Sequence, residues 1–451
     1  MKSAWVLVAC LGCSAEQLPP LGHVMVFLDT DAPLRRSEGP PPAIDEPQPL
    51  FDGVSVDVFA SGATEPCCSE DFELTEEQVR AGASFVVRLE GEGGAPRVRA
   101  RMYRILLGVE APPAPETVVE VVAELPAQPE EGATEVTLFL PTDAVGVPNG
   151  TLEAPSPVIP GRPAPSRVGT WPGAARRGCA EPPGPGEVCV PGGAFWMGHP
   201  LAPTLDPTSF TRPPPRLVVL SPFYLDAHEA TVADLRATGE APNYQWSGSR
   251  AGTSIFDWCT FTRQATAGFD NDNLPVNCNS WYRAQDYCLA RGADLPSEAQ
   301  LEYASGGLAS RLYLWGLDEA SCSDAVWGRC GGILAGYPAD CLPAMDIGGP
   351  APVGTQGARD RLELPTGVIT DLAGNLHEWT LDAYQPLDGP CWVDRFVLTD
   401  PLCAEESSLR TVRGGSWGLA EAHLRATFRF AENLPTATVG FRCARHAEPA
   451  P

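Results

Sequence analysis

Short apolar runs separated by polar stretches dominate the first third of the chain. Each run is rich in β-branched and aromatic residues, which is the composition typical of strands. Proline, glycine and acidic residues fill the stretches between the runs, as expected for turns. We therefore predict strands over residues 24–28, 54–59, 84–89, 98–107, 117–125 and 135–140.

One of these runs shows which of its faces meets water. Arg97, Arg99 and Arg101 alternate with apolar residues, as on a strand with one wet face. Six strands of this kind predict an all-β, sandwich-like domain over residues 21–142. The chain then becomes rich in proline, and over residues 143–184 we predict an extended, semi-rigid linker.

The pattern changes again from about residue 185. Tryptophan becomes frequent and glycine turns recur every ten or so residues, which predicts an α+β domain over residues 185–446 with much irregular structure. We expect a helix from about Thr231, a second over residues 281–290 capped by Ser280, and a short third helix after Ser297.

Composition and charge exclude several classes of function. The formal net charge is −26, which argues against a nucleic-acid partner because phosphate binding needs basic side chains. Lys2 is the only lysine. A Schiff base with pyridoxal phosphate and a Walker-type phosphate loop both require a lysine, so these two enzyme classes are excluded for the mature chain.

The N-terminus has the features of a bacterial lipoprotein signal. Lys2 precedes an apolar run that ends in Leu7-Val8-Ala9-Cys10, which has the form of a lipobox, and Cys13 after Leu11-Gly12 is the competing lipidation site. The run is too short to span a bilayer. We expect residues 1–13 to be the signal and the protein to be exported, with contact to the membrane through the lipid only. The cell envelope, and there the outer membrane, is the expected location.

The cysteines indicate an oxidising compartment. Of the fifteen in the chain, thirteen remain after Cys10 and Cys13, and they lack the spacing of zinc ligands. Disulfides are therefore the expected state. Because thirteen is odd, one thiol is left free or pairs between chains. The adjacent Cys67 and Cys68 stay ambiguous, because a ring between neighbouring cysteines is strained.

A series of motifs in the last 250 residues resembles one family. They follow in this order: GGAFWMG (192–198), FYLD (223–226), LPV (274–276), GADLPSEAQLEYA (292–304), LWG (314–316), DLAGNLHEW (371–379), RGGSW (413–417) and GFRC (440–443). Together they are similar to the formylglycine-generating-enzyme, or sulfatase-modifying factor, domain family. The resemblance implies a modified C-type-lectin-like fold for residues 185–446.

The residues that carry the chemistry of that family are missing. Family members that generate formylglycine hold copper with two thiolates between the GGSW and GFRC motifs. Here the interval from Gly418 to Arg442 contains no cysteine. A second branch holds iron with three histidines, but the six histidines of this chain are scattered and show no His-x-x-x-His spacing. We therefore expect neither copper nor iron and assign no catalytic residue.

The resemblance also implies a structural calcium ion. By position its ligands are the side chain of Asp371, the backbone carbonyls of Gly374 and Leu376, and the carboxylate of Glu378. Such hard oxygen ligands suit calcium. The alternative is that Glu378 only stabilises a turn. Asp346 is the expected ligand of a second, less complete calcium site.

Two further expectations come from the family. Cys288 is expected to form a disulfide with Cys443. Ser416, Trp417, Arg425 and Arg429 are candidates for lining a peptide groove, although the two arginines could instead pair with buried carboxylates.

We conclude that the sequence favours a lipid-anchored envelope protein. Its family domain is expected to serve as a non-catalytic binding or structural module for a protein, a peptide or an envelope component. The alternative is an oxidoreductase of the same family that acts on a protein or peptide thiol through a metal site of unrecognised form.

Overall fold

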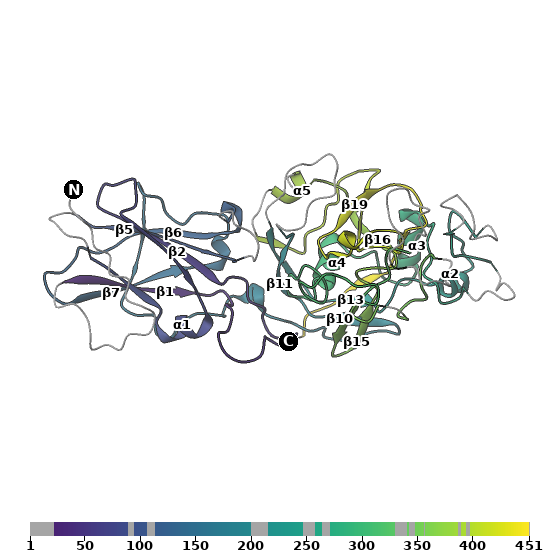
Figure 1. The fold of residues 1–451 in the computed structure, drawn as a ribbon, viewed down its shortest axis with the longest axis horizontal. Coiled ribbons are helices and arrows are strands. Elements are labelled where there is room, and N and C mark those ends of the chain that lie inside the picture. Colours follow the sequence, from purple (N-terminus) through teal and green to yellow (C-terminus); the bar gives the residue numbers. More distant parts are fainter. Residues whose placement is uncertain are drawn as a thin grey trace. The chain divides into compact units, whose positions relative to one another are not determined.

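The structure is a computed structural model of the chain, and it falls into two compact units (Figure 1). Unit 1 is Met1–Ala175 and unit 2 is Arg176–Pro451. The described residues are 22–88, 94–105, 113–199, 215–246, 258–263, 271–329, 341, 348–355, 357–386, 389–393 and 397–450. Each unit is treated below by itself.

Unit 1 contains two sheets. The five-stranded sheet has the order β3-β2-β5-β6-β8 and the four-stranded sheet the order β4-β1-β7-β9. Strands occupy all six predicted runs. Their bounds are β1 His23–Thr30, β2 Gly53–Phe59, β4 Ser84–Val87, β5 Arg97–Tyr103, β6 Val119–Glu124 and β7 Ala133–Leu140. On β5 the burial alternates residue by residue, and Arg99 and Arg101 both pair with Asp57 on the neighbouring β2, at 2.7 and 2.9 Å.

Within residues 21–142, one strand and one α-helix of the described part were not predicted. The first is β3 (Cys68–Glu73), an acidic strand at the sheet edge. The second is the helix α1 (Glu76–Ala81), which begins with a capping box between Thr75 and Gln78. The described part of unit 1 therefore also contains one short α-helix, together with the 3-10 turns η1 (Pro115–Thr117), η2 (Thr142–Ala144) and η3 (Pro172–Ala174).

Most of the stretch predicted as a linker instead belongs to unit 1. Within residues 143–184, β8 (Ser156–Pro157) pairs with β6, and β9 (Ile159–Pro160) pairs with β7. Proline lacks an amide hydrogen and is tolerated at sheet edges. Two-residue strands at the ends of both sheets accommodate these prolines, so proline content alone did not distinguish a linker from a sheet edge.

The described residues of unit 2 form four small sheets, and Figure 1 labels several of their strands. Their orders are β10-β13-β21, β11-β12-β17, β14-β15 and β19-β18-β16-β20. The strands are β10 Glu187–Val190, β11 Gly193–Met197, β12 Arg216–Leu220, β13 Phe223–Asp226, β14 Arg361–Leu364, β15 Gly367–Thr370, β16 His377–Ala383, β17 Val397–Thr399, β18 Arg410–Arg413, β19 Arg429–Glu432, β20 Val439–Gly440 and β21 Ala444–His446.

All three predicted helices are present in unit 2. They are α2 (Val232–Ala237), α3 (Trp281–Ala290) and α4 (Glu298–Ser305), and α5 (Pro390–Val393) and the 3-10 turn η5 (Glu421–Leu424) complete the set of described helices. Ser280 precedes α3, but its side chain makes no capping hydrogen bond. The capping predicted for Ser280 is therefore wrong, whereas Ser297 and Gln300 form a capping box at α4.

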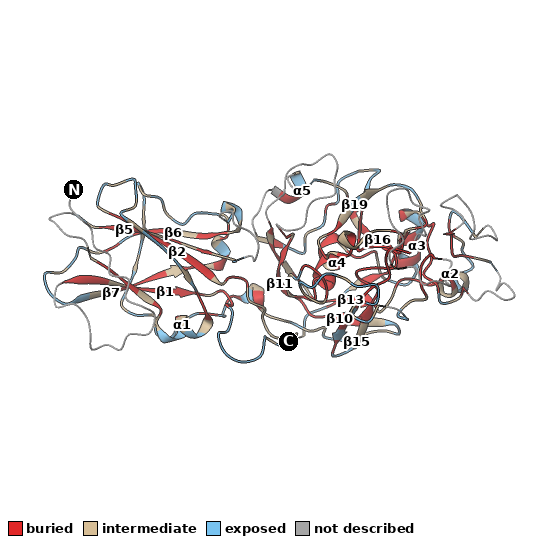
Figure 2. Ribbon diagram, viewed as in Figure 1, coloured by how far each residue is buried: buried red, intermediate tan, exposed pale blue. Residues whose placement is uncertain are grey.

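One hydrophobic core cluster of unit 2 joins α3 to β16 and β18, and Figure 2 colours most of β16 as buried. The inward face of α3 contributes Trp281, Ala284 and Tyr287, and they pack with Trp379 and Phe441. A disulfide joins Cys288 on α3 to Cys443, the pair that the resemblance implies, with the Cα atoms 5.5 Å apart. The end of the chain is thereby fixed to the core.

No helix among the described residues is both long enough and apolar enough to cross a membrane.

Candidate functional site

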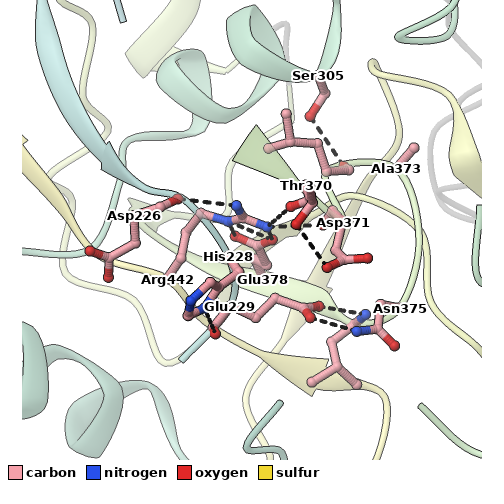
Figure 3. Close-up of polar contacts among 12 residues, drawn as sticks. Asp226, His228, Glu229, Ser305, Thr370, Asp371, Ala373, Asn375, Glu378 and Arg442 are labelled. Atoms are coloured by element: carbon pink, nitrogen blue, oxygen red, sulfur yellow. Dashed lines mark hydrogen bonds and ion pairs between the residues drawn. The ribbon is translucent and has the colours of Figure 1, made fainter. Parts of the chain in front are cut away.

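The candidate site is a group of buried charged side chains between three sheets of unit 2. Strand β13 ends at Asp226, β15 ends just before Asp371, and Arg442 lies between β20 and β21. Because β21 pairs with β13, Arg442 is brought beside Asp226. Figure 3 shows the guanidinium of Arg442 surrounded by oxygen atoms from several of these segments.

Arg442 is the central residue of the group, and it is fully buried. Its guanidinium makes a paired contact with the Glu378 carboxylate, with N–O distances of 2.7 Å from both Nε and Nη2. Nη2 also reaches the backbone carbonyls of Thr370 and Asp371, at 2.9 Å each, and Nη1 donates to that of Asp226, at 3.2 Å. A planar guanidinium can satisfy several acceptors in this way.

Two further carboxylates shape the loop that connects β15 to β16. Asp360 accepts hydrogen bonds from the amides of Leu372, Ala373 and Gly374, at 2.9 to 3.1 Å. Glu229 accepts from the amide of Leu376 at 2.8 Å and from the side chain of Asn375 at 2.7 Å. Asp371 and Asn375 have positive φ angles of 58° and 65°. Asp and Asn tolerate this conformation better than most residues.

Negative charge exceeds positive charge at this centre. Burial raises the pKa of Glu229, Asp371 and Glu378, and it raises that of Asp360 to about 7. Burial alone would lower the pKa of Arg442, but Glu378, Glu229 and Asp371 raise it above its ordinary value. The arginine therefore stays charged, and ionising all four carboxylates together is unfavourable without a further cation or protons.

The structure places the predicted calcium ligands as follows. Asp371 accepts hydrogen bonds from Gly354 and Thr370 through one carboxylate oxygen, and Glu378 is bound to Arg442. Gly374 and Leu376 lie in the loop held by Asp360 and Glu229. The described residues contain no group of three or more His, Cys, Asp or Glu side chains arranged to hold a metal. Asp346 lies outside the described residues, as do Cys10 and Cys13.

The candidate groove residues do not come together on an open surface. Ser416 and Trp417 are buried, and the indole nitrogen of Trp417 donates to the carbonyl of Ala437. Only Arg425 is left partly exposed and without an ion pair among the described residues.

Arg429 supports the alternative in which arginine pairs with a buried carboxylate. It binds Glu298 on α4 at 2.6 Å, and its side chain is only 8% exposed. Burial alone would raise the pKa of Glu298, but Arg429 and Arg413 lower it to about 2. The motif pattern does not say which of its residues face water, and the groove assignment stays a prediction.

The cysteines of unit 2 are not available as thiolate ligands within the described part of the chain. Five disulfides, Cys179–Cys189, Cys259–Cys278, Cys288–Cys443, Cys322–Cys341 and Cys391–Cys403, account for all of them. The free cysteines that the structure describes, Cys67 and Cys68, belong to unit 1.

Sequence reasoning missed the roles of three residues at this centre. Glu229 and Arg442 lay in segments that resemble the family, but the motifs did not show that one holds the loop and the other binds Glu378. Nothing in the sequence marked Asp360 as a site residue, because it lies outside every recognised motif and between short irregular segments. Its role depends on its approach to amides 12 to 14 residues away.

Comparisons with known proteins agree with the motifs. The family model described as "Sulfatase-modifying factor enzyme 1-like domain" matches residues 174–447. The chain is 27% identical over 299 residues to "Inactive C-alpha-formylglycine-generating enzyme 2" of Mus musculus, covering 58% of this chain and 86% of the relative. It is 29% identical over 298 residues to the formylglycine-generating enzyme of Thermomonospora curvata, covering 57% and 93%.

Among solved structures, PvdO from Pseudomonas aeruginosa aligns with a TM-score of 0.40 and 20% identity, over 58% of this chain and 94% of PvdO. The family model alone covers more than half of the chain, all of it within or at the edge of unit 2. The chain therefore belongs to the family of proteins with a sulfatase-modifying factor, or formylglycine-generating-enzyme-like, domain.

Proposed function

We propose that unit 2 is a non-catalytic binding or structural module, carried by a lipid-anchored protein of the bacterial envelope. The C-type-lectin-like fold implied by the motifs is part of this proposal, and its ligand would be a protein, a peptide or an envelope component. The strongly acidic composition favours a partner other than nucleic acid.

One observation carries the non-catalytic assignment. Copper(I) is held in proteins by soft sulfur ligands, above all by thiolates. All cysteines in the described part of unit 2 are in disulfides, and residues 418–442 contain none. A two-thiolate copper centre therefore has no ligands there. That one relative bears the word "inactive" in its name supports the same conclusion.

A copper titration tests this proposal. The full chain should be prepared with Cys10, Cys13, Cys67 and Cys68 replaced by serine, so that thiols outside unit 2 do not contribute. After incubation with copper(I) and desalting, we expect no stoichiometric copper, whereas the Thermomonospora curvata enzyme serves as the positive control. One copper per chain would contradict the proposal and favour the oxidoreductase alternative.

The lipid anchor is the second part of the proposal. Cys10 in Leu7-Val8-Ala9-Cys10, or else Cys13, would be acylated. Mass spectrometry of the membrane-extracted protein should find an acylated N-terminal cysteine, and replacing both cysteines by serine should release the protein from the membrane fraction. A wild-type chain that is found only in the soluble fraction would contradict the anchor.

We also propose a structural calcium ion at residues 371–378. The donors available are oxygens, as calcium requires, and four buried carboxylates surround a single buried guanidinium. The ligands would be the Asp371 side chain, the carbonyls of Gly374 and Leu376, and Glu378, which would be shared with Arg442. A calcium ion would supply positive charge where carboxylates are in excess.

Metal removal tests the calcium site. If calcium binds only the folded state and is present at a hundredfold excess over Kd, its removal should lower the Tm by roughly 5–10 °C. The Asp371→Ala variant should show a smaller shift. An unchanged Tm after verified metal removal would count against this site.

A further inference from the structure

Two neighbouring cysteines in unit 1 take no part in the candidate site or in the disulfide framework described above. Cys67 is exposed, and Cys68 is partly buried at the start of β3. The amide and the thiol of Cys67 both donate to the carbonyl of Val58, at 2.8 and 3.3 Å. Cys68 follows directly in the chain, and Cys67 is among the groups that raise the pKa of its thiol. The contact with Val58 thus fixes the Cys67 thiol, and the next residue in the chain carries a second unbonded thiol.

Both thiols are unbonded in a chain that otherwise forms disulfides. The five disulfides take up every other cysteine of the described residues. A disulfide between adjacent cysteines would close a strained ring, and strained disulfides are easily reduced. Burial also raises the pKa of the Cys68 thiol to about 11, with further contributions from Cys67 and Glu70. Because the thiolate is the species that reacts with oxidants, this environment favours the dithiol.

The surroundings of the pair are acidic and open. β3 is an edge strand, and Glu65 and Glu70, on either side of the pair in sequence, are exposed. Cys67 and Glu70 both act to raise the pKa of the Cys68 thiol. A nucleophilic cysteine is usually activated by a nearby positive charge, so these thiols are poorly suited to nucleophilic catalysis. Carboxylates would instead attract a cation.

We propose that Cys67 and Cys68 form a dithiol site for a thiophilic centre, either a soft metal cation or a trivalent metalloid, that bonds both sulfurs at once. Soft ligands select such centres, and two sulfurs held together bind more tightly than either one alone.

The binding reactions involve no change of oxidation state. A divalent cation replaces the two thiol protons, which are released to solvent. A trivalent arsenical of the form R–As=O forms two As–S bonds, and its oxygen leaves as water with the two thiol protons. Neither reaction needs an oxidant or a reductant.

The test uses the full chain with Cys10→Ser and Cys13→Ser, so that the cysteines of the signal do not compete. After free thiols are counted under native conditions, the protein is titrated with phenylarsine oxide or with Cd²⁺. Intact-mass measurement should show one arsenical per chain with the loss of one water, and peptide mapping should place it on residues 67 and 68. Cys67→Ser and Cys68→Ser should each weaken binding on the order of 100-fold.

Two controls show whether the paired thiols themselves form the site. Cys330→Ser, which removes the remaining cysteine of unit 2, should leave binding unchanged. Glu70→Gln should weaken the binding of Cd²⁺, which is charged, and leave that of the neutral arsenical unaffected. Undiminished affinity for the arsenical in either single serine variant, no adduct in the parent chain, or recovery of residues 67 and 68 as a disulfide would each overturn the proposal.

Discussion

At the scale of single residues, the most consequential side chain of unit 2 is Arg442. It is fully buried and brings together the ends of β13 and β15 and the start of β16 through Asp226, Thr370, Asp371 and Glu378. The planar guanidinium of arginine can bind the Glu378 carboxylate and several carbonyls at once. The ammonium group of a lysine has no such planar set of donors.

Removing the guanidinium should therefore destabilise unit 2 strongly. The Arg442→Gln variant leaves Glu378 buried without its partner, and breaking one side of a buried ion pair costs about 3–5 kcal/mol. Arg445→Gln is the matched control, because its pair with Glu187 lies at the surface, with the arginine side chain 34% exposed. That change should cost at most about 1 kcal/mol.

Urea unfolding followed by tryptophan fluorescence measures both variants, because nine of the eleven tryptophans belong to unit 2. Equal losses of stability in the two variants would contradict the role given to Arg442.

A second prediction for a single residue is that Asp382 makes the stability of unit 2 depend on pH. It accepts hydrogen bonds from the amides of Glu298 and Cys403. Burial, and then the nearby Glu298, raise its pKa from 3.8 to about 7. Because the folded-state pKa lies above the unfolded one, the contribution of Asp382 to stability is complete below about pH 4 and is lost as the pH rises toward 7.

The Asp382→Asn variant cannot ionise, so its stability relative to wild type should improve between pH 5 and 8, on the order of 2 kcal/mol. The exposed Asp286→Asn on α3 is the control and should show no such trend. A stability difference between Asp382→Asn and wild type that stays constant over this range would refute the assignment.

At the scale of elements, the sequence could predict helices and strands whose apolar residues recur at a regular spacing. It could not predict strands that are held by backbone pairing with a neighbouring strand. The bounds of α3 could be predicted because Ala284, Tyr287 and Cys288 recur at helical spacing and form its apolar face. β3 escaped detection, because its sequence CSEDFE has no apolar alternation and it is held mainly by backbone pairing with β2. α1 had a readable signal in Thr75 and Gln78, which form its capping box.

The disulfide from α3 to Cys443 should make the largest single contribution among the five disulfides. Its two cysteines lie 155 positions apart in the sequence. The chain-entropy model assigns the closure of such a loop about 5 kcal/mol of stability. Cys179–Cys189 closes a loop of only 10, worth about 3 kcal/mol. Denaturant unfolding of the paired serine variants should give the larger loss for Cys288 and Cys443. The reverse order would show that native-state packing, rather than loop closure, decides the effect.

At the scale of the whole molecule, the order of the motifs along the chain was enough to indicate the family of unit 2. Which of its buried charged residues contact one another could be learned only from the structure. The motif at residues 371–379 marked an important loop, but its shape depends on Glu229 and Asp360, which are distant in sequence or outside every motif. The same limit applies to Arg429, whose ion pair with Glu298 crosses 131 positions. Proline content likewise could not show that residues 156–160 belong to the sheets of unit 1.

The most direct test of the central claim, that unit 2 has lost the family's oxidation chemistry, is an aldehyde assay. The full chain is incubated with copper, oxygen and a peptide that contains the sulfatase sequence Cys-x-Pro-x-Arg, with the Thermomonospora curvata enzyme as positive control. Because unit 2 offers no thiolate pair between Gly418 and Arg442, we predict no aldehyde above a reaction without protein. Aldehyde formation above that background would contradict the non-catalytic account.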